Sequence, residues 1–88
     1  MSKILYMIRK PLNVIEEGLL PDFTSVRDHS NTSLLLLEDG VISQHVPNVP
    51  MHALSDDVIQ RSVTTTVPLL SYQEVVRLLF DVDRVVVL

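Results

Sequence analysis

Residues 34–41 read Leu-Leu-Leu-Leu-Glu-Asp-Gly-Val, and this stretch decides the fold class of the chain. Four leucines in a row are typical of a strand buried on both faces, because a strand with one exposed face would alternate apolar and polar residues. The apolar run ends at Glu38, and Gly40 can adopt the positive φ that a sharp turn allows. The stretch therefore predicts a buried strand followed at once by a tight turn.

Apolar blocks of similar length flank this strand on both sides. They are Ile4–Ile8, Met51–Leu54, Val67–Leu70 and Val85–Leu88. Pro68 cannot donate to a sheet ladder, so its strand is expected at a sheet edge. Short buried strands separated by helices or turns predict an α/β fold with a mainly parallel sheet of about five strands. Two buried faces need helices on both sides, as in a small three-layer α/β/α domain, or helices on one side and a partner on the other. With 88 residues, the chain has room for one domain, residues 1–88.

The clearest helix signal is the capping box Ser71-Tyr72-Gln73-Glu74. Behind it, one side of the predicted helix is apolar and is expected to face the sheet; it consists of Tyr72, Val75, Val76, Leu79 and Phe80. Ser55-Asp56-Asp57 opens a shorter helix, with Val58 and Ile59 expected inside. Acid–base chemistry by the two adjacent aspartates is the weaker interpretation, because neighbouring helical residues point in different directions.

The connections that follow the first and second predicted strands give weaker signals. Pro11 suits a first helical residue, and Leu12, Ile15 and Leu19 follow at helical spacing, whereas residues 21–32 are expected to form a loop. The link from Asp39 to Pro50 has room for about one helical turn, over 41–45. One sheet face is therefore expected to be poorly covered and to serve as an interface.

Composition excludes several classes of function. The chain has no cysteine, so it can form neither a disulfide nor a persulfide. A net charge of −4 argues against unaided binding to nucleic acid or to an anionic membrane. The apolar runs are too short for a membrane span, and we expect a cytoplasmic protein without a cofactor.

Few residues suggest a site. His29, His45 and His52 have no metal-ligand spacing, and an interface role is the better interpretation of the last two. Asp39, Gly40 and Val41 follow a buried strand at the carboxyl edge of the sheet, where α/β proteins bind ligands, although a plain turn explains them as well. Arg9 and Lys10 end the first strand at the same edge and form a basic group with Lys3. They are solvated charges, or contacts to a partner's carboxylate or to RNA phosphate in an assembly.

Three stretches in this order resemble the TusB/DsrH family of sulfur-relay subunits. They are Leu34–Val41, His52–Arg61 and Leu69–Leu78, which read LLLLEDGV, HALSDDVIQR and LLSYQEVVRL. The family shows a leucine-rich strand ending in an (E/Q)-D-G-V turn, a strand leading to A-L-x-x-D-(L/V)-x-A-R-G, and a late helix start of the form (I/L)-x-Y-x-(E/D)-(F/V)-V-x-L. Ser62 stands where the family often has Gly.

The resemblance implies an α/β/α subunit that assembles with TusC/DsrF-like and TusD/DsrE-like partners. In the Tus branch such complexes pass persulfide sulfur toward 2-thiouridine at the tRNA wobble position, and in the Dsr branch they serve oxidative sulfur metabolism. Since the sulfur-carrying cysteine belongs to a partner, the chain is expected to be a non-catalytic subunit that meets tRNA at most indirectly. Self-association, a stand-alone small-molecule-binding or regulatory domain, and an enzyme in its own right are the alternatives.

Overall fold

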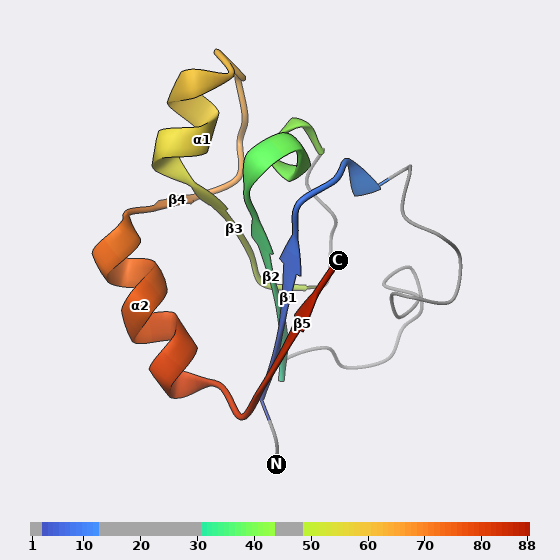
Figure 1. Ribbon diagram of the computed structural model, residues 1–88, viewed down its shortest axis with the longest axis vertical. Coiled ribbons are helices and arrows are strands. Elements are labelled where there is room, and N and C mark those ends of the chain that lie inside the picture. Colours follow the sequence, from blue (N-terminus) through green and yellow to red (C-terminus); the bar gives the residue numbers. More distant parts are fainter. Residues whose placement is uncertain (1–2, 13–30, 44–48) are drawn as a thin grey trace.

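The computed structural model describes residues 3–12, 31–43 and 49–88, and these contain a five-stranded parallel sheet. The strands are β1 (Ile4–Ile8), β2 (Thr32–Leu36), β3 (Met51–Leu54), β4 (Leu69–Leu70) and β5 (Arg84–Val87). Their order is β4-β3-β2-β1-β5, and every neighbouring pair is parallel (Figure 1). The predicted α/β fold class is confirmed.

Three helical segments connect the described strands. A 3-10 turn, η2 (Glu38–Ile42), follows β2, α1 (Ser55–Gln60) follows β3, and α2 (Tyr72–Asp81) joins β4 to β5. The Ser71 hydroxyl accepts from the Glu74 amide at 3.3 Å, and Glu74 Oε1 accepts from the Ser71 amide at 3.1 Å. The predicted capping box is therefore confirmed.

The core has two layers because successive strand residues point to opposite faces of the sheet. One layer lies on the side of η2 and α1; it contains Ile8, Leu34, Leu36, Val41, Val49, Met51, Ala53, Val58 and Val67. The other lies under α2; it contains Leu5, Leu35, Leu54 and Val75, with Met7, Leu37, Leu70, Leu78 and Val82 packed against it. Both faces of β2 are thus buried, as the leucine run predicts.

The predicted strand bounds differ from the structure at β2, which begins at Thr32 and ends at Leu36, and at the two edge strands. β4 is only Leu69–Leu70, because Pro68 lacks an N–H; its carbonyl accepts from the Ala53 amide at 2.9 Å, and the strand lies at an edge as predicted. The loop predicted for 21–32 ends one residue too late, since Thr32 pairs with Ile4 in β2. The rest of that loop before Asn31, and the helix predicted beyond Leu12, lie outside the described residues.

The predicted inner face of α2 is wrong for most of its members. Only Val75 is buried, whereas Tyr72 is 59% exposed, Val76 52%, Leu79 38% and Phe80 88%. The residues that meet the sheet are Val75, Leu78 and Val82, so the apolar side of α2 is wider than its contact. We call Tyr72, Val76, Leu79 and Phe80 the outer stripe. Ile59 of α1, also expected inside, is exposed.

The sequence predicts that one sheet face is poorly covered, and the short crossover that motivates this prediction does not leave its own side bare. The crossover from β2 to β3 belongs to the layer of η2 and α1, and there Leu34, Leu36 and Ala53 are fully buried. Exposed apolar residues lie on α2 and on β5, at Val85 and Val87. Others lie outside the sheet on η2 and α1, at Ile42 and Ile59. None of the described helices is long and apolar enough to cross a membrane.

Candidate functional site

The carboxyl edge of the sheet is where the sequence placed most of its candidate residues. There η2 turns tightly over the end of β1: the Leu37 amide donates to the Ile8 carbonyl at 3.0 Å and the Gly40 amide to the Leu37 carbonyl at 2.9 Å. The Ser43 amide donates to the Gly40 carbonyl at 3.0 Å. One backbone hydrogen bond therefore joins the start of the turn to β1, and two more hold the turn itself.

Gly40 is required at this edge for a reason other than the one predicted. A Cβ on Gly40 would lie 2.0 Å from the Ile8 carbonyl oxygen and 2.8 Å from its carbon. Backbone groups cannot yield as a flexible side chain can, so only glycine allows η2 to lie this close to β1. The positive φ predicted here belongs to Glu38, at 52°.

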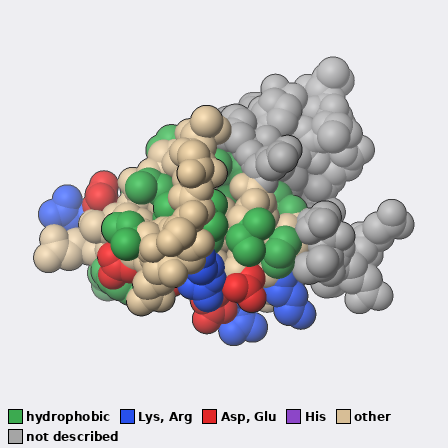
Figure 2. All heavy atoms as spheres, turned by 90° about the horizontal axis from the view of Figure 1, so that it is seen from above, with side chains coloured by type: hydrophobic (Ala, Val, Ile, Leu, Met, Phe, Trp, Pro, Cys, Tyr) green, Lys and Arg blue, Asp and Glu red, His purple; other side chains and the backbone are tan. Residues whose placement is uncertain are grey.

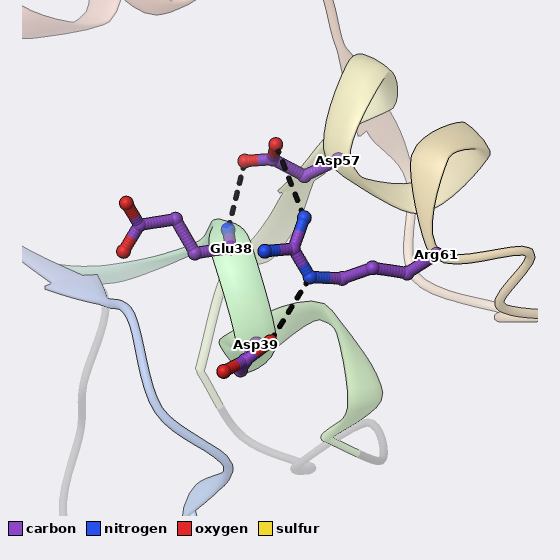
Figure 3. A network of polar contacts seen from close by, with 4 residues as sticks. All are labelled: Glu38, Asp39, Asp57 and Arg61. Atoms are coloured by element: carbon purple, nitrogen blue, oxygen red, sulfur yellow. Dashed lines mark hydrogen bonds and ion pairs between the residues drawn. The ribbon is translucent and has the colours of Figure 1, made fainter.

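Asp57 of α1 and Arg61, the residue that follows this helix, hold the turn from the other side (Figure 3). Asp57 Oδ2 accepts from the Glu38 amide at 2.7 Å, and Asp57 Oδ1 lies 3.5 Å from Arg61 Nη1. Arg61 Nε donates to Asp39 Oδ1 at 3.1 Å. Because Asp57 supports a residue with positive φ, its hydrogen bond offsets the strain of that conformation.

This cluster is arranged to fix structure rather than to react. Both oxygens of Asp57 are occupied, its side chain is only 13% exposed, and the Arg61 guanidinium bridges two carboxylates. The Glu38 carboxylate points away from Arg61 (Figure 3). Within the described ranges, no group of three or more His, Cys, Asp or Glu side chains could hold a metal.

Gly40 and Val41 are both buried, so neither can touch a ligand or partner directly, contrary to the interface or ligand role proposed for them. Asp39 is exposed, but it is paired with Arg61. Seen from above the carboxyl edge, cationic and anionic side chains lie next to one another (Figure 2). Mixed charge of this kind gives no single-sign field that would attract an anionic ligand.

The three residues of the predicted basic group lie at opposite ends of β1 and do not come together. Arg9 and Lys10 follow β1 at the carboxyl edge and are exposed. Lys3 lies at the opposite end, where its backbone amide donates to Asp83 Oδ2 at 2.8 Å and its Nζ lies 3.1 Å from Asp81 Oδ2. Only Arg9 and Lys10 therefore remain candidates for a contact at the carboxyl edge.

His52 is half-buried in β3, paired with Leu35 on the face that α2 covers. Its side chain is thus only partly accessible, and the interface role predicted for it stays a prediction, whereas His29 and His45 lie outside the described residues. Hydrogen bonds with the Ser71 backbone and hydroxyl hold the pKa of Glu74 below its usual 4.5, and nearby Arg77 and His52 add to that effect.

The contact between the α1 segment and the turn after β2 was not predicted from the sequence. Asp57 was assigned to helix capping, yet it supports the turn at Glu38, and Arg61 reaches Asp39 in the same turn. The i, i+4 spacing of Asp57 and Arg61 was a usable signal, because it places both side chains on one side of a helix. Their target in η2 depends on tertiary structure.

Searches against protein-family models, curated proteins and solved structures find no match to this chain.

Proposed function

We propose that this chain is a cytoplasmic, non-catalytic subunit of a sulfur-relay complex that supports 2-thiolation of the tRNA wobble uridine. The resemblance of three ordered motifs to TusB/DsrH subunits motivates the proposal. The parallel five-stranded sheet agrees with the α/β/α fold that this resemblance implies.

The contacts at the carboxyl edge support a scaffold role. The first motif forms β2 and η2, and the second forms β3 and α1; the two are joined by Asp57 at Glu38 and by Arg61 at Asp39. Their polar residues are thus accounted for by folding, without a reaction. A chain that lacks cysteine must leave a persulfide to a partner.

The observation that carries the proposal is the exposed apolar surface of α2 and β5. Phe80 is 88% exposed, and Val76 and Val87 are each more than half exposed. Val76 and Phe80 are four residues apart on α2 and therefore neighbours on its surface. Exposed apolar residues of this size favour a surface that is covered by another protein. We infer that the partners are TusC/DsrF-like and TusD/DsrE-like subunits.

Direct tRNA binding is not part of the proposal. The net charge is −4, and the basic residues Arg9 and Lys10 lie beside the mixed charges of the carboxyl edge. Nucleic-acid surfaces need a concentrated positive charge to release counterions. The chain would therefore act on tRNA through its partners.

The experiment is a deletion of the gene followed by measurement of 2-thiouridine in bulk tRNA. We expect the 2-thiouridine content to fall and to return when the wild-type chain is supplied. A matched variant, Gln73→Glu, alters an exposed polar position of α2 and should restore the modification equally well. Unchanged 2-thiouridine in the deletion strain would refute the proposed pathway.

A further inference from the structure

We draw no further inference here: the strongest candidate, the apolar surface patch made of the outer stripe of α2 with Val85 and Val87 of β5, belongs to the partner interface already proposed, and nothing in the described residues shows which other molecule would cover it.

Discussion

Replacing Gly40 with alanine tests whether η2 really lies against the backbone of β1. The new Cβ would stand 2.0 Å from the Ile8 carbonyl oxygen, far inside any contact distance that carbon and oxygen tolerate. The turn or the end of β1 must then move by about 1 Å. That movement strains the 3.0 Å hydrogen bond from the Leu37 amide to the Ile8 carbonyl.

The expected cost combines overpacking, about 1–3 kcal/mol, with the weakened hydrogen bond, about 1 kcal/mol. Alanine also lowers the conformational entropy of the unfolded chain, which offsets roughly 0.4–1 kcal/mol of this cost. The free energy of unfolding should therefore fall by about 1–3.5 kcal/mol, which lowers the Tm of a domain this size by roughly 4–28 °C.

Urea unfolding followed by circular dichroism measures this change, with Asp39→Ala as the matched control. Asp39 is the preceding residue, and its ion pair is solvent-exposed, so its loss should cost no more than about 1 kcal/mol. Gly40 does not need positive φ. Without the close approach, Gly40→Ala would therefore stabilise the protein by up to about 1 kcal/mol. A neutral or stabilising effect would refute the reasoning.

Three further changes probe other parts of the structure. Asp57→Ala should lower the free energy of unfolding by about 1–3 kcal/mol, because the first amide of η2 loses its acceptor. Asp56→Ala is the control and should have little effect, and chemical denaturation measures both variants. Leu35→Ala empties a site that is 1% exposed and should cost about 2–5 kcal/mol in the same assay. The folded state lowers the pKa of Glu74, so its contribution to stability is present above the unfolded pKa and is lost as pH falls through the folded pKa. Thermal melts of Glu74→Gln and wild type should therefore differ less at pH 3 than at pH 6, and an equal difference at both would contradict the assignment.

The strands and the capping box were predictable because their signals are local. Ile4–Ile8 and Met51–Leu54 form strands with the predicted bounds, since unbroken apolar runs suit only a buried sheet. In the Ser71–Glu74 motif both hydrogen-bond partners lie within four residues of sequence. Pro68 marks an edge strand by its missing donor alone.

The remaining features depend on contacts between distant segments. Periodicity shows that α2 is apolar over a wide arc, but it cannot say which part of that arc meets the sheet. Phe80 is therefore exposed although it shares the spacing of a core residue. Likewise, the need for glycine at Gly40 comes from Ile8, and the role of Asp57 comes from Glu38.

Affinity capture from the native cell tests the central claim most directly. With the tagged chain as bait, the account predicts co-purification of a DsrE-like subunit whose cysteine carries a persulfide detectable by mass spectrometry. Recovery of the tagged chain without any cysteine-bearing partner would contradict it.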